Sequence, residues 1–211
     1  IACSNGLGHV RRTVLLAEDL SDKGANVVVF APRVAVRRIA VALNVQIKFR
    51  IIEFQTHTNA EIFRTGNRSV LDWHKQLPSL DDFDLVVSDN LPEILEVRPD
   101  AWLSGNFFWH DALPGIYPEY IARANQLMTD SYPRLLTYGP FSFCSNTQNV
   151  QIVNCSIPVS KNVYKSPVKN ALLVTCGTGG EAQTQYREFL DRLLFENVQE
   201  FSKVFVDPTI I

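Results

Sequence analysis

A glycine-rich segment near the start of the sequence constrains the fold of this chain more than any other feature. The segment reads Cys3-Ser4-Asn5-Gly6-Leu7-Gly8-His9, follows two apolar residues, and precedes apolar residues at helical spacing over 14–20. A glycine turn between a strand and a helix lets the backbone approach a ligand closely and directs helix-terminal N–H groups at an anion. His9 falls in the first turn of that helix, where an imidazole can transfer protons. The segment therefore predicts the floor of an active site.

Strand and helix patterns alternate after this segment. Continuous apolar runs at 27–31 and 85–89 are typical of buried parallel strands. Pro92 stands early in the first turn of a short helix that follows the second of these runs. This alternation predicts a doubly wound α/β fold. The remaining patterns predict strands at 47–54, 101–108, 136–138 and 150–153, and helices at 34–43 and 117–134.

The opening pattern recurs near the end of the sequence. A strand at 171–175 leads into a second glycine loop, Cys176-Gly177-Thr178-Gly179-Gly180, which a helix at 182–195 and a strand at 203–206 follow. We therefore expect two Rossmann-type doubly wound domains with a ligand between them, the second one incomplete in this chain. The expected divisions are an N-terminal domain over 1–155, a linker over 156–170, and the start of a C-terminal domain over 171–211.

Composition and charge argue against several classes of protein. The formal net charge of −2 disfavours a nucleic-acid partner, because that affinity comes mainly from clustered Lys and Arg. No run approaches the roughly 20 apolar residues of a transmembrane helix, while contact with a membrane surface stays open. The four cysteines are scattered without a CxxC pair, which favours reduced thiols over disulfides or a zinc site. We expect a cytoplasmic protein that uses no metal ion and no other cofactor.

The predicted topology brings two polar residues together. The first and fourth strands are neighbours in a doubly wound sheet, and His9 and Asp89 stand at their carboxyl ends. A histidine beside a carboxylate suits a general base, because the carboxylate fixes the tautomer and stabilises the imidazolium. Simpler roles stay open: either residue could cap a helix. His110-Asp111 is a rival acid–base pair at the end of the following strand.

Three motifs, taken in order, resemble the GT-B-fold glycosyltransferases. The segment from Gly6 to Arg12 is similar to the GxGH-type loops of the peptidoglycan N-acetylglucosaminyltransferase and UDP-glycosyltransferase groups. Val87-Ser88-Asp89 at one strand end, with Gly105-Asn106-Phe107-Phe108-Trp109 on the next strand, resembles the second half of that N-terminal domain. The run from Leu173 to Gly180 resembles the start of the donor-binding domain. The resemblance thus implies an acceptor-side domain over 1–155 and the start of a nucleotide-sugar-binding domain over 171–211.

The resemblance implies an inverting, metal-independent transfer of a hexosyl group from a nucleotide diphosphate sugar, with a UDP-sugar as the expected donor. His9 would take the proton of an acceptor hydroxyl while Asp89 orients the imidazole. Lipid-linked and glycan-linked hydroxyls are the candidate acceptors. The implied substrate-binding residues are Gly6, Gly8, Arg11, Asn106 and His110, and the implied donor pyrophosphate-binding residues are Gly177, Thr178, Gly179 and Gly180.

The first loop also departs from the family pattern and keeps two alternatives open. Many small-molecule glycosyltransferases follow the histidine with xxP, whereas this chain has Val10-Arg11-Arg12. Loops of the form GxGHxxR occur in a UDP-sugar hydrolase of the same fold, where water is the acceptor. The other alternative is a non-catalytic nucleotide-binding or dinucleotide-binding protein. An NAD site is disfavoured because Arg11 replaces the last glycine of G-x-G-x-x-G and the second strand ends without an acidic residue.

Overall fold

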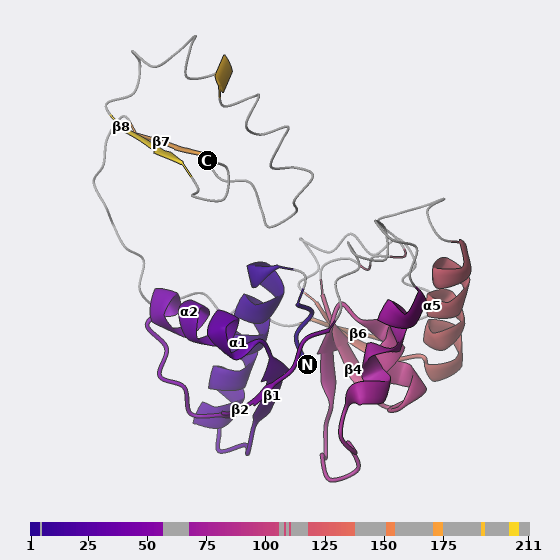
Figure 1. The fold of residues 1–211 in the computed structure, drawn as a ribbon. Helices are drawn as coiled ribbons and strands as arrows, with labels where there is room; N and C mark the ends of the chain where they lie inside the picture. Colours follow the sequence, from indigo (N-terminus) through magenta and orange to yellow (C-terminus); the bar gives the residue numbers. More distant parts are fainter. Residues whose placement is uncertain are drawn as a thin grey trace. The chain divides into compact units, whose positions relative to one another are not determined.

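The chain forms two compact units, Ile1–Ser160 and Lys161–Ile211, and each is described by itself (Figure 1). In the second unit, β7 (Ala171–Val174) and β8 (Lys203–Val206) pair in parallel, as the sequence predicts. The limits of the domains expected from the sequence stay predictions. The computed structural model describes residues 1–4, 6–56, 68–105, 108, 110, 118–137, 151–154, 171–174, 191–192 and 203–206.

The first unit alternates strands with helices, which confirms the predicted α/β class. The predicted strands are all present among the described residues. Most are shorter than the apolar runs that predict them, because hydrogen bonding to the neighbouring strand ends before the apolar residues do. Most of the helix expected at 182–195 lies outside the described residues. The elements of this unit are α1 (Leu7–Asp22), β1 (Val28–Ala31), α2 (Arg33–Leu43), β2 (Arg50–Glu53), η1 (Arg68–Gln76), β3 (Val87–Asp89), η2 (Pro92–Glu96), β4 (Trp102–Ser104), α5 (Pro118–Ser131), β5 (Arg134–Thr137) and β6 (Gln151–Asn154).

The first residues of the chain join two groups of parallel strands. β1 pairs with β2, and β3, β4, β5 and β6 pair in that order. The backbone N–H of Ile1 donates to Val87 (2.7 Å), and the carbonyl of Ile1 accepts from Asp89 (2.9 Å). On the other side, Ala2 donates to Phe30 (3.0 Å). Figure 1 accordingly draws the N-terminus between β1 and β4.

The resulting strand order is β2, β1, residues 1–3, β3, β4, β5, β6. In chain order this is third, second, first, fourth and onward, which is the order of doubly wound nucleotide-binding sheets. The predicted neighbourhood of the first and fourth strands is thus confirmed. The switch point, where the strand order reverses, lies between residues 1–3 and β3.

Alternate residues of the central strands enter two different hydrophobic cores, because successive side chains of a strand point to opposite faces. Ala2 and Val29 pack with Val10 and Val14 of α1 and with residues of α2. Their chain neighbours on the opposite face pack with residues of η1, η2 and α5, in the core that contains Ile1, Cys3, Phe30, Trp73, Ile94, Leu95 and Met128. The sheet is therefore covered on both faces, as a parallel sheet requires.

Candidate functional site

The carboxyl ends of two adjacent strands place His9 against Asp89. Asp89 is the last residue of β3, and His9 lies in the first turn of α1, directly after the strand-like residues 1–3. His9 Nδ1 lies 2.5 Å from Asp89 Oδ1, although the two residues are 80 apart in sequence. Both are buried, with 7% exposure for His9 and 1% for Asp89. The structure therefore brings together the two residues that the sequence predicts as a pair.

Two further side chains complete the hydrogen bonding of Asp89. Arg12 donates from Nε to Oδ2 (2.9 Å) and from Nη2 to Oδ1 (2.8 Å). Ser104, the last residue of β4, donates from Oγ to Oδ2 (3.0 Å). An ionised carboxylate offers about four lone-pair sites, so His9, Arg12 and Ser104 together supply every donor that it can accept. These donors fix the orientation of the carboxylate.

The short contact to Asp89 decides the tautomer of His9. An anionic oxygen 2.5 Å from Nδ1 requires a proton between the two atoms, so we assign that proton to Nδ1. Burial alone would raise the pKa of Asp89, but the hydrogen bonds from His9 and Arg12 outweigh burial and hold the pKa below its usual range. Asp89 is therefore a carboxylate at neutral pH, and the lone pair of neutral His9 is on Nε2.

The Nε2 atom of His9 is not engaged by the described residues. It makes no hydrogen bond to any described residue, and the side chain keeps 9% exposure. Gly8, one residue earlier, is exposed, and a Cβ placed on it would meet no atom within 4 Å. The described residues therefore leave room beside Gly8 at the start of α1. A neutral imidazole with an accessible Nε2 can accept a proton from a bound hydroxyl or water.

The loop before α1 is fixed by the backbone conformation of Gly6 and by two hydrogen bonds to a residue that follows β2. Gly6 stands at the helix N-cap with φ of 121°, a conformation that favours glycine. The Ser4 amide donates to Thr56 Oγ1 (2.8 Å), and the Thr56 amide donates to Ser4 Oγ (3.0 Å). Thr56 is fully buried and follows β2. These two hydrogen bonds join the loop to the segment after β2 and so fix the position of the first turn of α1, which contains His9.

The two capping roles that the sequence left open are wrong. The N-cap of α1 is Gly6, and no side chain caps that helix end. Leu91 occupies the N-cap of η2, again without a side-chain hydrogen bond. The side chain of Asp89, the last residue of β3, contacts His9, Arg12 and Ser104 instead.

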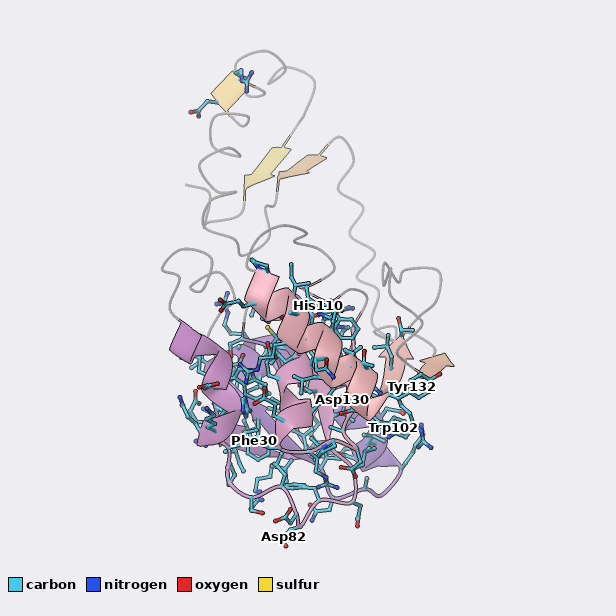
Figure 2. The ribbon with its side chains drawn as sticks, turned by 90° about the vertical axis from the view of Figure 1, so that its right-hand side faces the viewer. Phe30, Asp82, Trp102, His110, Asp130 and Tyr132 are labelled. Atoms are coloured by element: carbon cyan, nitrogen blue, oxygen red, sulfur yellow. The ribbon has the colours of Figure 1, made fainter. Side chains whose placement is uncertain are left out.

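The other expected site residues are placed differently. Arg11 is exposed, and its neighbour Arg12 makes the contact with the pair. His110 is buried and stacks on Phe108, with ring centroids 5.4 Å apart. In Figure 2 His110 lies at the end of the unit opposite to Asp82, which precedes β3, so it is on the side of the strands' carboxyl ends. Its expected partner Asp111, the expected substrate contact Asn106 and the expected pyrophosphate contacts Gly177, Thr178, Gly179 and Gly180 lie outside the described residues.

A second buried carboxyl lies only four residues after Asp89. Glu93 in η2 is 2% exposed, and neither of its oxygens makes a hydrogen bond. The indole N–H of Trp73 and the hydroxyl of Tyr120 interact weakly with this carboxyl, but neither reaches good hydrogen-bond geometry with it. Burial raises the pKa of Glu93 to about 7. The sequence analysis did not single out this residue, because its helical position and its polarity are ordinary for a surface glutamate.

Sequence reasoning also missed Arg12, Ser104 and Thr56 as parts of the site. A role for Arg12 could be predicted from its spacing, because residues three apart on a helix share a face and Arg12 is three residues after His9. A contact of Ser104 with Asp89 could be predicted because Ser104 ends the strand that follows in the sheet. Among the described residues, no three His, Cys, Asp or Glu side chains gather where they could hold a metal ion, and no helix is long and apolar enough to span a membrane.

No protein-family model matches this sequence, and no curated protein matches it either. The function is therefore inferred from the geometry around His9.

Proposed function

We propose that the protein is a GT-B-type glycosyltransferase that moves a sugar from a nucleotide diphosphate sugar, with a UDP-sugar as the expected donor, to a hydroxyl acceptor. The observation that supports this proposal is the 2.5 Å contact of His9 Nδ1 with the buried carboxylate of Asp89, while Nε2 makes no hydrogen bond to any residue that the structure describes. The site lies where two adjacent parallel strands end, the usual position of ligands in doubly wound sheets. The glycine loop before α1 agrees with the same function.

The proposed chemistry needs one proton transfer and one displacement. Nε2 of His9 takes the proton of the acceptor hydroxyl, and Asp89 stabilises the imidazolium that forms. The acceptor oxygen attacks the anomeric carbon, and the bond from that carbon to the diphosphate oxygen breaks with inversion. The nucleoside diphosphate leaves with the bonding electrons. Backbone N–H groups at Gly177–Gly180 are the expected contacts of its pyrophosphate.

A nucleotide-sugar hydrolase is the second candidate. Arg12 stands at the last position of the GxGHxxR pattern, and it contacts both members of the pair. The geometry would serve a water molecule in place of the acceptor hydroxyl, because Nε2 needs only an O–H group within hydrogen-bond reach. The two candidates share the base, the donor and the leaving group, and they differ only in the acceptor.

Release of nucleoside diphosphate from UDP-, GDP- and dTDP-sugars by the full-length protein tests the proposal, with CMP-sugars and NAD as further ligands in a thermal-shift panel. His9→Ala should lower turnover about 100- to 10,000-fold while the donor still raises the melting temperature. Arg37→Ala, a change at an exposed position of α2, is the control and should keep wild-type turnover. Near-normal turnover by His9→Ala would remove His9 as the base.

The product separates the two candidates. Release of free sugar at the full rate without any acceptor would favour the hydrolase, whereas release that depends on an added alcohol would favour the transferase. Stabilisation by NAD alone, with no effect of any nucleotide sugar, would contradict both and would favour a dinucleotide-binding protein.

A further inference from the structure

The outer face of α2 carries two exposed valines to which neither the core nor the proposed reaction gives a role. Val34 is 71% exposed and Val41 is 82% exposed, the highest values among the large hydrophobic residues that the structure describes. They are seven residues apart and so lie two turns apart along one line of the helix. The inner face of α2, with Val36, Ile39 and Ala40, packs in the core beside α1. The two valines therefore contribute little to the packing of α2.

Two arginines flank the line of valines. Arg37 and Arg38 are three and four residues after Val34, and at 3.6 residues per turn these positions lie on opposite sides of that line. Both arginines are exposed, and neither guanidinium forms an ion pair with any residue that the structure describes. The outer face of α2 thus has an apolar centre with a positive charge on each side.

The charges in the sequence around α2 have a single sign. Residues 23–52 contain six Lys and Arg and no Asp or Glu, although the whole chain has a net charge of −2. Two of the six cations have acidic partners in α1, since Lys23 pairs with Asp19 and Lys48 pairs with Asp22. The arginines on the outer face of α2 have none there, so this face attracts an anionic partner.

An anionic membrane surface fits this face better than other anionic partners do. A membrane stabilises apolar side chains that enter the headgroup region, together with cations that reach lipid phosphates beside them. A protein partner usually binds through buried aromatic anchors, and residues 33–43 contain no aromatic residue. A second copy of this chain would bring Arg37 and Arg38 against the same two charges. A nucleic acid would bind the arginines through its phosphates but would leave the valines exposed.

We propose that the outer face of α2 binds an anionic lipid surface, with Val34 and Val41 in the headgroup region and Arg37 and Arg38 on lipid phosphates. The axis of α2 then lies parallel to the membrane plane, because the two valines stand on one line of the helix. Binding through a single short helix face is weak and reversible, and salt weakens it further. The inference does not depend on the proposed function, because the proposed reaction uses no residue of α2.

Co-sedimentation of the full-length protein with lipid vesicles at low salt tests the role of the arginines. The protein should bind vesicles of equal parts phosphatidylglycerol and phosphatidylcholine, and should bind pure phosphatidylcholine vesicles much more weakly. Arg38→Gln should lower the affinity for the anionic vesicles about fivefold, and Arg37→Gln/Arg38→Gln about 25-fold. Lys75→Gln is the control, because it removes an exposed cation from η1 instead, and it should change the affinity less than about twofold.

The valines are tested separately from the charge. Val34→Gln/Val41→Gln keeps both arginines and should lower the affinity for the anionic vesicles about tenfold, because less apolar surface leaves water. Both positions are exposed, and glutamine is at least as favourable in a helix as valine, so the variant should keep the wild-type unfolding midpoint. Val97→Gln is the control, because it changes a valine that is 45% exposed after η2, and it should keep the wild-type affinity.

The possible results lead to different conclusions. No binding to the anionic vesicles, or equal binding to both kinds of vesicle, overturns the proposal. Unchanged binding by the valine variant would show that the face attracts any polyanion, which overturns it too, as would a DNA duplex that binds as tightly as the vesicles do. A dimer in solution that the valine variant abolishes would assign the face to a second copy instead. Loss of vesicle binding in both α2 variants and in neither control supports the proposal, whether or not the protein turns over nucleotide sugars.

Discussion

Two buried carboxyl groups, four residues apart in the chain, have opposite electrostatic behaviour in this protein. Asp89 and Glu93 are 1% and 2% exposed, so water solvates neither of them. Asp89 accepts hydrogen bonds from His9, Arg12 and Ser104, and its pKa lies below the usual range despite the opposing effect of burial. The oxygens of Glu93 make no hydrogen bond of good geometry, and burial outweighs the weak stabilisation by Trp73 and raises its pKa to about 7.

The difference shows that partners, and not burial, decide the charge of an acidic residue here. Desolvation penalises both carboxylates, and only Asp89 has donors that compensate for it. Those donors come from α1 and β4, which meet at the carboxyl end of β3. Glu93 lies near Trp73 of η1 and Tyr120 of α5, whose polar groups do not reach good hydrogen-bond geometry with it. At pH 7 Asp89 is therefore an anion, whereas Glu93 is about half protonated.

Removal of the Asp89 carboxylate should have the largest effect on stability. Asp89→Ala leaves the donors of His9 and Ser104 buried without their acceptor, which costs about 1–3 kcal/mol for each group, while the 35% exposed Arg12 side chain loses its partner but can reach solvent. Urea unfolding at pH 7 measures the loss. Asp100→Ala, which breaks the exposed ion pair with Arg98, is the matched control and should cost less than about 1 kcal/mol. Equal losses in the two variants would contradict the contrast between compensated and exposed acids.

Glu93 should make stability fall as pH rises through neutrality. Its pKa rises from 4.5 in the unfolded chain to about 7 in the folded one, so the folded state binds more protons between these values. Stability is therefore highest below pH 4.5 for this group and decreases by about 3 kcal/mol by pH 8. Glu93→Gln keeps the shape without the ionisation and should flatten this decrease.

The measurement is the unfolding free energy of wild type and Glu93→Gln at pH 5 and pH 8. Glu119→Gln, a change at an exposed position of α5, is the control and should keep the wild-type pH dependence. Asp89 gives the opposite sign: its stabilisation is present above its unfolded pKa and is lost as pH falls through the lowered folded value. The same pH slope in Glu93→Gln and wild type would show that Glu93 is solvated or paired.

The smallest of the expected effects concerns a single donor to Asp89. Ser104→Ala removes one hydrogen bond to a buried carboxylate, which is worth about 1.5 kcal/mol. Ser79→Ala removes the same kind of bond at the surface, from Ser79 to Asp81, and should change stability by less than about 0.5 kcal/mol. Thermal unfolding of both variants measures the difference. A larger loss from Ser79→Ala would be inconsistent with the role assigned to burial.

The order of the strands could be predicted from apolar runs and a glycine turn in the sequence. Apolar runs such as Val27–Ala31 can only be buried on both faces, and glycine at position 6 suits the turn into α1. These local signals, together with the general topology of doubly wound sheets, suffice to predict that His9 and Asp89 are neighbours. Strand ends were less predictable, because pairing partners decide where a strand stops. β2 begins at Arg50, three residues after the start of its apolar run.

The sequence by itself determined the α/β class, the neighbourhood of the first and fourth strands, and the candidate base with its carboxylate. Only the tertiary structure decided that Arg12, and not Arg11, reaches Asp89, because the choice depends on the rotation of α1 against the sheet. The tertiary structure alone also decided the different charge states of Asp89 and Glu93. Asp89 and Glu93 look equally polar in the sequence, and their donors come from segments far away in the chain.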